Sequence, residues 1–308
     1  MKQVVFIFPG QGAQKAGMGR DLYDAFPEAR RVFDAHPDIR DLCLNGTEAD
    51  LKQTSVTQPA IYLVSMAIRA VLEAKGVRPV AAAGHSLGEY SALASAGVFS
   101  VDEGMLLVRE RGWLMQDEGS KIPGGMAAII GLDDAQVKEI CAGLTGIVEP
   151  VNFNAPGQVV ISGEKAAIER SLDVFTEKGA RMAIPLAVSG AFHSSLLAGV
   201  GKDFGVFLAG KRYAAPSFKV AANVDAEYYA APSEVPAKLS RQIHNPVLWT
   251  AIVKKFVDDG FRDFVEVGPG NVLKGLMKKI DPALKVDTTA SAAELNAVLA
   301  KVLGGEAG

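Results

Sequence analysis

The sequence predicts an α/β fold in which a small βαββαβ domain, residues 123–188, is inserted into a large domain formed by residues 1–122 and 189–308. Three observations support this prediction. Short apolar runs of strand length alternate with longer segments of helical periodicity along the chain. A serine flanked by glycines follows one such run and precedes an Ala-rich helical segment. Between residues 123 and 188 the order of elements becomes that of a split ferredoxin-like unit.

The bulk composition limits the class of protein and the kind of partner. The chain has 308 residues, 49% of them hydrophobic and 22% charged, which is ample for a buried core. Its net charge of −3, without any Lys/Arg-dense run, argues against a nucleic-acid binder. Cys43 and Cys141 belong to no C-x-x-C pair or Cys/His cluster, so we expect neither a disulfide framework nor a metal site. Such cysteine usage suits the reducing cytoplasm.

The first predicted strand is Val4–Phe8. Its apolar run is too short for a secretory signal and ends at Pro9-Gly10. No apolar segment approaches the length of a membrane span, so we expect no membrane association. The glycine-rich turn after the strand lacks the Lys-Ser/Thr pair of a phosphate loop. In a hydrolase-like sheet the same loop supplies an oxyanion amide, here that of Gln11.

Helices are expected between the first two strands. The segment from Arg20 to Asp50 is polar and mostly helical, and His36 is expected there as a solvated loop residue. A helix with one apolar face begins at Thr57-Gln58-Pro59 and ends at Gly76. It leads into a short buried strand, Val80–Ala83.

The next stretch, Gly84-His85-Ser86-Leu87-Gly88, matches the G-x-S-x-G pattern of a nucleophile elbow. The bare pattern is also compatible with structural punctuation, but the strand before it and the helix after it, which ends at Gly97, favour a nucleophile. The sharp turn strains Ser86, and glycines at 84 and 88 are needed where a Cβ would collide with a neighbouring element. At this turn the backbone amide of Leu87 and the positive end of the helix dipole face any oxyanion that forms.

A helix over Val101–Gln116 and the small domain come next. The helix carries the charged triplet Arg109-Glu110-Arg111, and its spacing alone predicts a solvated face for Arg111. The expected elements of the small domain are the strands Gly125–Leu132, Gly146–Asn154, Gln158–Ser162 and Arg181–Val188 and the helices Asp133–Leu144 and Lys165–Gly179. A cleft between the two domains is the natural place for a site.

A serine nucleophile needs a base, and the chain has four histidines. His85 adjoins the serine and is expected to point away from it, while His36 and His244 lie beside proline-containing loops. His193 is therefore the best base by elimination, with a satisfied core imidazole as the alternative. The remaining expected elements are the strand Phe218–Asn223, a loop over Gln242–Val247, the helix Trp249–Asp259, the strand Phe264–Val267 and a terminal helix, Ser291–Val302.

Motifs from the whole length of the chain occur together in one known family. They are Phe8-Pro9-Gly10-Gln11-Gly12, Thr57-Gln58-Pro59-Ala60, Gly84-His85-Ser86-Leu87-Gly88-Glu89-Tyr90, Arg111-Gly112, Asn152-Phe153-Asn154, Pro156-Gly157-Gln158, Gly190-Ala191-Phe192-His193, Asn245-Pro246-Val247 and Glu266-Val267-Gly268-Pro269-Gly270. In this combination the chain resembles the malonyl-CoA:acyl carrier protein transacylases of fatty-acid synthesis. It departs from them at Ser195, where proline is common, and in the loose segment 199–201, which puts the local rigidity after His193 in question.

The resemblance implies roles for eight residues. Ser86 is the acylated nucleophile, His193 the general base, and Leu87 and Gln11 the sources of the oxyanion amides. Gln242 matches the position whose backbone carbonyl orients the imidazole in place of an acid. Arg111 binds the malonyl carboxylate, against the solvated face that its spacing predicts, and Met115 and Phe192 lie beside the substrate. A buried charge pair is worth about 2–5 kcal/mol and one methyl group only about 1–3 kcal/mol, so charge selects malonyl over acetyl more strongly than Phe192 excludes methylmalonyl.

The implied reaction is a ping-pong transfer of the malonyl group from malonyl-CoA to the phosphopantetheine thiol of acyl carrier protein, without a bound cofactor. The alternatives are a serine esterase or thioesterase, an acyltransferase serving a polyketide synthase or malonate decarboxylase, and a non-catalytic synthase subunit. Carrier proteins are acidic, so we expect a basic patch near the cleft. We further expect a cytoplasmic monomer that binds acyl carrier protein and a coenzyme A thioester, but neither nucleic acid nor membrane.

Overall fold

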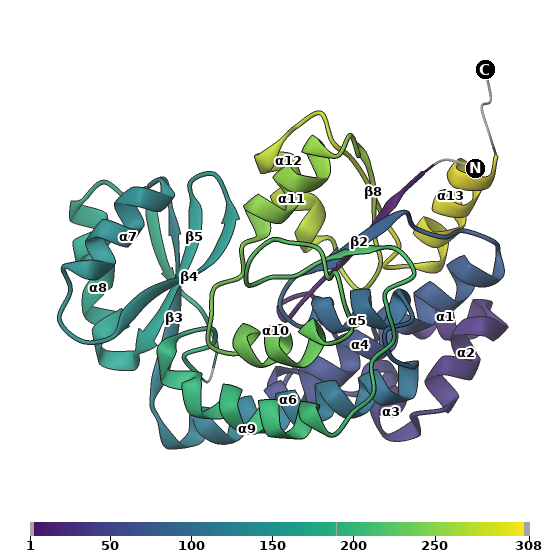
Figure 1. Cartoon of the computed structure of the whole chain (residues 1–308), viewed down its shortest axis with the longest axis horizontal. Coiled ribbons are helices and arrows are strands. Elements are labelled where there is room, and N and C mark those ends of the chain that lie inside the picture. The colour runs from purple at the N-terminus through teal and green to yellow at the C-terminus, as the bar shows by residue number, and fades with distance from the viewer. Residues whose placement is uncertain (1–2, 189, 305–308) are drawn as a thin grey trace.

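The computed structural model describes residues 3–188 and 190–304, which form two sheets with helices packed on them (Figure 1). The larger sheet is parallel with the strand order β7-β2-β1-β8-β9, and the smaller is antiparallel with the order β4-β5-β3-β6. The strands of the larger sheet are β1 (Val5–Phe8), β2 (Ala81–Gly84), β7 (Lys219–Ala221), β8 (Asp263–Glu266) and β9 (Lys285–Thr288). The α/β class expected from the sequence is confirmed.

The parallel sheet is covered on both faces, as the continuous apolar strands require. Successive residues of a strand point to opposite faces, and β1 illustrates this: Phe6 and Phe8 belong to one buried cluster, Val5 and Ile7 to another. The first cluster is shared with α4 (Thr54–Ala74), α5 (Gly88–Ser95) and α6 (Val101–Lys121); the second is shared with α11 (Trp249–Asp258) and α12 (Val272–Ile280).

Short helices complete the larger part of the molecule. Between β1 and α4 lie α1 (Arg20–Ala25), α2 (Pro27–Asp34), α3 (Pro37–Asn45) and the 3₁₀ turn η1 (Asp50–Lys52), and near the end of the chain lies α13 (Ala292–Leu303). The α-helices fall in segments predicted to be helical or mostly helical, whereas η1 begins at the last residue of the predicted segment. His36 is half-buried at the N-cap of α3.

Several predicted boundaries and segments need correction. Helix α4 begins at Thr54, three residues before the predicted start, and α6 continues to Lys121. Four elements were not predicted: α9 (Ala198–Ala209), which follows the 3₁₀ turn η2 (Ser195–Leu197), α10 (Glu234–Gln242), α12 and β9. Gln242 is thus the last residue of a helix, although it was predicted to begin a loop.

Helix α4 also qualifies the expectation that no segment approaches the length of a membrane span. By length and composition, Thr54–Ala74 is long and apolar enough to cross one, but 78% of its most apolar window is buried inside the protein. A buried core helix can have the length and apolar composition of a membrane span. Helix α4 is such a core helix, because it packs between α2 and α6.

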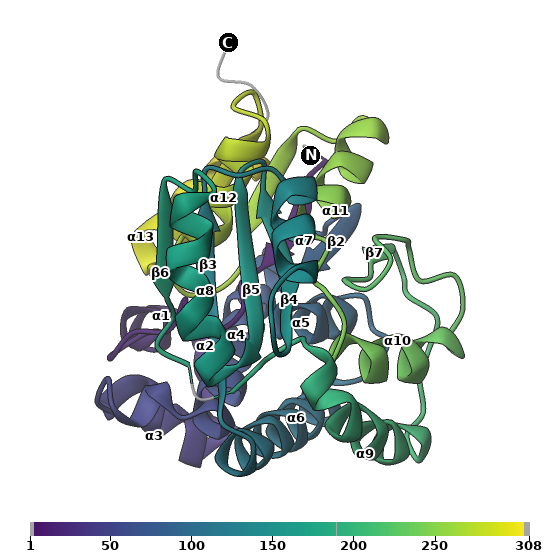
Figure 2. The same ribbon diagram turned by 90° about the vertical axis from the view of Figure 1, so that its left-hand side faces the viewer.

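The smaller sheet has the predicted order of elements. These are β3 (Gly124–Ile130), α7 (Asp134–Ala142), β4 (Val148–Ala155), β5 (Gln158–Glu164), α8 (Lys165–Glu177) and β6 (Met182–Pro185). Asp133 and Gln136 form a capping box that starts α7. Helices α7 and α8 lie on one face of the sheet, which is turned toward the viewer in Figure 2. Met126, on the opposite face of β3, packs into the core of the larger part. Ser189, the first residue after the predicted insert, lies outside the described residues.

The carboxyl ends of three neighbouring parallel strands bring together segments that are far apart in the chain. Gln11 follows β1, Ser86 follows β2 and Asn223 follows β7, and β2 lies between the other two strands. In open α/β sheets, this edge is where ligands bind.

Candidate active site

Ser86 occupies the strained turn that the sequence predicted. Its φ is 50°, in the left-handed region that few non-glycine residues adopt. A Cβ on Gly84 would overlap the main chain of Gly88, and a Cβ on Gly88 would overlap the carbonyl of Phe8. The predicted need for both glycines is therefore confirmed. Leu87 forms the N-cap of α5, so Ser86 lies directly before the positive end of that helix.

His193 lies within hydrogen-bond distance of this serine. Its Nε2 is 2.7 Å from Ser86 Oγ, and its Nδ1 is 2.8 Å from the backbone carbonyl oxygen of Gln242. A carbonyl can only accept, so Nδ1 carries the proton and Nε2 is free to accept one from the serine. His193 also has a positive φ of 64° and is 4% exposed. The imidazole is thus fixed by a backbone carbonyl.

Burial and the Arg111 guanidinium lower the pKa of His193 to about 3. Burial dominates because it disfavours the charged imidazolium, and the nearby cation repels it further. The imidazole is consequently neutral at physiological pH, which is the form that a general base requires.

Arg111 is 1% exposed, in contrast to the solvated face predicted from spacing alone. Its Nη2 donates to Ser86 Oγ and to Gln242 Oε1, each at 3.0 Å, and its Nη1 donates to Gln58 Oε1 at 2.8 Å. The guanidinium carbon lies 5.4 Å from the centre of the Tyr90 ring, a cation–π distance. A buried cation beside a nucleophile is suited to an acyl group that carries its own negative charge.

The two amides expected to bind an oxyanion belong to the same cavity. Gln11 and Leu87 both line a cavity of about 320 Å³ together with Ser86, Arg111 and His193. Neither amide donates to a hydrogen-bond acceptor within residues 3–188 and 190–304. Two unengaged N–H groups beside a serine are what a tetrahedral intermediate needs.

Met115 and Phe192 also line this cavity, and both are buried. The sulfur of Met115 accepts from Gln58 Nε2 at 3.4 Å, so the methionine supports the residue that holds Arg111. All eight residues singled out in the sequence lie in or directly behind one cavity; Gln242 is the one behind it.

Other polar residues at the site were missed as functional candidates. Asn223 accepts from the Ser86 amide at 2.7 Å and donates to the carbonyl of Gly84, so it pins both sides of the elbow. Asn223 is the last residue of the predicted strand Phe218–Asn223, and its position at the end of a strand of the parallel sheet could have indicated a functional residue. Gln58 and Glu89 lie on helices whose other residues are mostly buried, and a polar residue in such a run marks a buried polar contact.

His85 was expected to point away from the serine. Its Nε2 bonds to Asn154 Oδ1 at 2.8 Å, and its ring packs at 5.8 Å from that of Trp249. The residue nevertheless lines the cavity. Burial lowers its pKa, so it adds no positive charge near His193 at neutral pH.

Comparison with known proteins gives consistent results. The acyl transferase domain family matches residues 5–297. Malonyl CoA-acyl carrier protein transacylases are similar to the chain: that of Staphylococcus aureus (strain MRSA252) is 38% identical over 294 residues, covering 93% of this chain and 95% of its own, and that of Bacillus subtilis (strain 168) is 36% identical over 293 residues, covering 92% of each.

Solved structures agree with this result. The chain superposes on malonyl-CoA:acyl carrier protein transacylase from Xanthomonas oryzae with a TM-score of 0.93 and 39% identity, covering 98% of both chains. It superposes equally well, at 40% identity and over 97% of its length and 100% of the other chain, on a malonyl-transacylase solved in complex with a type II polyketide synthase acyl-carrier protein.

Proposed function

The chain belongs to the family of malonyl-CoA:acyl carrier protein transacylases, and we propose that Ser86, His193 and Arg111 carry out its transfer of malonyl groups from coenzyme A to an acyl carrier protein. One observation carries the assignment of these residues. Ser86 Oγ lies 2.7 Å from His193 Nε2 and 3.0 Å from Arg111 Nη2, so one atom contacts both a base and a buried cation.

The first half-reaction makes an ester and releases coenzyme A. His193 Nε2 takes the proton of Ser86 Oγ, and the oxygen attacks the thioester carbonyl of malonyl-CoA. The amides of Leu87 and Gln11 bind the oxyanion. When the C–S bond breaks, the imidazolium returns its proton to the leaving sulfur, which leaves as the thiol of coenzyme A.

Arg111 selects the acyl group in this scheme. The guanidinium gives up its contact with Ser86 Oγ and binds the malonyl carboxylate, while Gln58 and Gln242 hold it from either side. Balancing the charge of the guanidinium also weakens, after burial, the largest cause that lowers the pKa of His193. A malonyl substrate therefore strengthens its own catalytic base, which an acetyl group cannot do.

The second half-reaction is the reverse of the first with a different thiol. His193 takes the proton of the carrier's phosphopantetheine thiol, whose sulfur attacks the malonyl ester, and passes that proton to Ser86 Oγ as the ester C–O bond breaks. Two thioesters and one ester exchange without oxidation or reduction, so the reaction uses no cofactor. Met115, Met126 and Phe192 give the cavity apolar walls that limit hydrolysis of the ester.

The carrier docking patch is assigned to α12. Gly270, just before this helix, lies beside Ala13 in the loop that lines the cavity, and Lys279 Nζ donates to Gln158 Oε1 of β5 at 2.7 Å. The helix therefore connects the loop after β1, whose residues Gln11 and Gly12 line the cavity, with the smaller sheet. Lys274 and Lys278 are exposed and have no ion pair among the described residues, which leaves their charge available to an acidic carrier.

We assign the remaining properties on the same basis. Residues 1–122 and 189–308 form the catalytic domain, and residues 123–188 form a ferredoxin-like domain that closes one wall of the cavity through Met126, Asn152 and Leu186. The protein acts as a monomer in the cytoplasm, where malonyl-CoA and carrier protein are available, and it engages no membrane.

A two-stage transfer assay tests this function against an esterase. The enzyme is first mixed with malonyl-CoA alone and then with a phosphopantetheinylated carrier. We expect one equivalent of coenzyme A to be released per enzyme in the first stage, followed by malonyl carrier in the second. The Ser86→Ala variant should release none. Continuous release of free malonate in the first stage would show a hydrolase and contradict the proposal.

A further inference from the structure

Glu89 is a buried carboxyl group that the mechanism above does not use. It lies one helical turn beyond Ser86 in α5 and has no exposed surface. Its Oε1 accepts from the Tyr229 hydroxyl at 2.5 Å. Its Oε2 accepts from Gln242 Nε2 at 2.6 Å and from the backbone N–H of Asn223 at 3.1 Å. A fully buried carboxylate with three donors is costly to bury unless a cation offsets it.

The contacts of Glu89 lead directly to Arg111. Gln242 Nε2 donates to Glu89, and Oε1 of the same amide accepts from Arg111 Nη2. Gln242 Nε2 also donates to the backbone carbonyl of Ser86 at 2.9 Å. An amide has one donor side and one acceptor side, so Glu89 and this carbonyl together fix which side faces the guanidinium. Burial lowers the pKa of Arg111 and raises that of Glu89, and the attraction between the two groups offsets part of each shift.

We propose that Glu89 is a positioning residue for Arg111: its carboxylate orients the Gln242 amide and balances the guanidinium until the malonyl carboxylate takes over as the counter-ion. This inference rests on the proposed function, because it needs Arg111 as the malonyl site. Two carboxylates beside one buried guanidinium repel each other, so arrival of the malonyl group favours uptake of one proton from solvent by Glu89.

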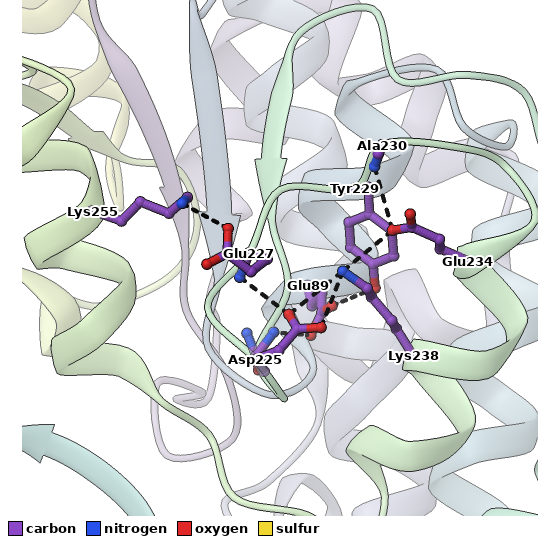
Figure 3. A network of polar contacts seen from close by, with 9 residues as sticks. Glu89, Asp225, Glu227, Tyr229, Ala230, Glu234, Lys238 and Lys255 are labelled. Atoms are coloured by element: carbon purple, nitrogen blue, oxygen red, sulfur yellow. Dashed lines mark hydrogen bonds and ion pairs between the residues drawn. The ribbon is translucent and has the colours of Figure 1, made fainter.

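The surroundings of Glu89 support this exchange. Burial raises the pKa of Glu89 to about 7, so a small further increase protonates it near neutral pH. The titratable or charged groups that face it are Tyr90 on its own helix, Arg111 on α6, Tyr229 after β7 and, beyond that ring, Lys238 on α10 with Asp225 and Glu234. In Figure 3 the ring of Tyr229 connects Glu89 with the charged groups around Lys238.

The sign of the pH effect follows from these charges. Below a pH of about 7 Glu89 is neutral, and the guanidinium attracts the malonyl carboxylate without competition. Above it, the ionised Glu89 competes for the same cation. The equilibrium ratio of malonyl to acetyl on Ser86 should therefore fall as pH rises from 6 to 8.5, by roughly tenfold for a coupling of one pKa unit.

The test measures that ratio by intact-protein mass spectrometry, with equal malonyl-CoA and acetyl-CoA and excess coenzyme A at each pH. Glu89→Gln should remove the pH dependence and keep the ratio that the wild type shows at low pH. A glutamine can keep all three contacts, since its Oε1 accepts from Gln242 and Asn223 while its Nε2 donates to the Tyr229 oxygen.

Two further variants sharpen the result. Tyr229→Phe removes a donor to the ionised carboxylate and should move the midpoint of the pH dependence upward. Glu266→Gln is the matched control, because Glu266 is also fully buried with a pKa of about 7 but contacts the start of α12. It should leave the pH dependence unchanged.

Each failure identifies what is wrong. A ratio independent of pH in the wild type, or a Glu89→Gln variant that keeps the wild-type pH dependence, would overturn the role of Glu89. The second outcome would point to His193, whose titration gives the same sign. If Glu89→Gln does not fold, an unchanged midpoint in Tyr229→Phe overturns the proposal instead. No acyl adduct on the wild type would overturn the proposed function itself.

Discussion

Replacing Arg111 by alanine should abolish the preference for malonyl over acetyl. The guanidinium is 1% exposed and lies 3.0 Å from the nucleophilic oxygen, so the pair it forms with a malonyl carboxylate is fully desolvated. Breaking such a pair costs about 2–5 kcal/mol, which is roughly a 30- to 5,000-fold loss in the ratio of kcat/KM for malonyl-CoA to that for acetyl-CoA. Loading of acetyl should change far less.

The assay follows coenzyme A release in the first half-reaction with each substrate. Arg109→Ala is the matched control, because Arg109 lies on the same helix but pairs with the exposed Asp38 at 2.8 Å, a contact worth less than about 1 kcal/mol. A thermal melt of each variant shows whether the orphaned oxygens of Gln58 and Gln242 have unfolded the Arg111→Ala protein. A folded Arg111→Ala enzyme whose ratio changes by less than threefold would refute the role of Arg111.

Three further outcomes follow from the structure. Burial and Arg111 hold the pKa of His193 near 3, so the rate of loading should not decline as the pH falls through 6.5. In Arg111→Ala the pH below which loading declines should be higher than in the wild type. A decline of the wild-type rate near pH 6.5 would contradict this assignment. Glu266→Ala should lower the free energy of unfolding by about 1–2 kcal/mol, measured by denaturant titration, because its carboxylate caps two amides of α12; no loss would show the cap to be unimportant. Lys278→Glu should slow transfer to the carrier but not loading from coenzyme A, and the control is Lys178→Glu, directly after α8. Equal loss of both steps would remove α12 from the docking patch.

The elbow could be predicted from the sequence because its constraints are local. A glycine is needed wherever a Cβ would strike backbone, and Gly84 and Gly88 satisfy that need two residues on either side of Ser86. The strands around it could be predicted for a similar reason, since each is a short apolar run bounded by turn residues.

Arg111 could not be placed from local sequence because its burial depends on other helices. Gln58 on α4, Tyr90 on α5 and Gln242 on α10 surround its guanidinium, and none of them is near it in the chain. The residue spacing on α6 indicates only that a charged triplet interrupts an apolar face, which does not reveal that one of the three side chains is buried. The buried role came from family resemblance.

Helix α9 was missed because its glycines lower helix propensity. Two of them face α10 at close range. A Cβ on Gly201 would overlap the His244 ring, and one on Gly205 would lie 2.9 Å from Ser240 Oγ. Ser240 also donates to the carbonyl of Gly201 at 2.7 Å. The glycines therefore serve packing between two helices, which a single sequence does not reveal.

The most direct test of the account is to locate the acyl group itself. The enzyme is incubated with malonyl-CoA, digested, and its peptides are sequenced by mass spectrometry, with His193→Ala and Ser86→Ala in parallel. We predict a malonyl ester on Ser86 in the wild type, a much slower appearance of the same ester in His193→Ala, and none in Ser86→Ala. A malonyl group on another residue, or an adduct that persists in Ser86→Ala, would contradict the assignment of Ser86 as the nucleophile.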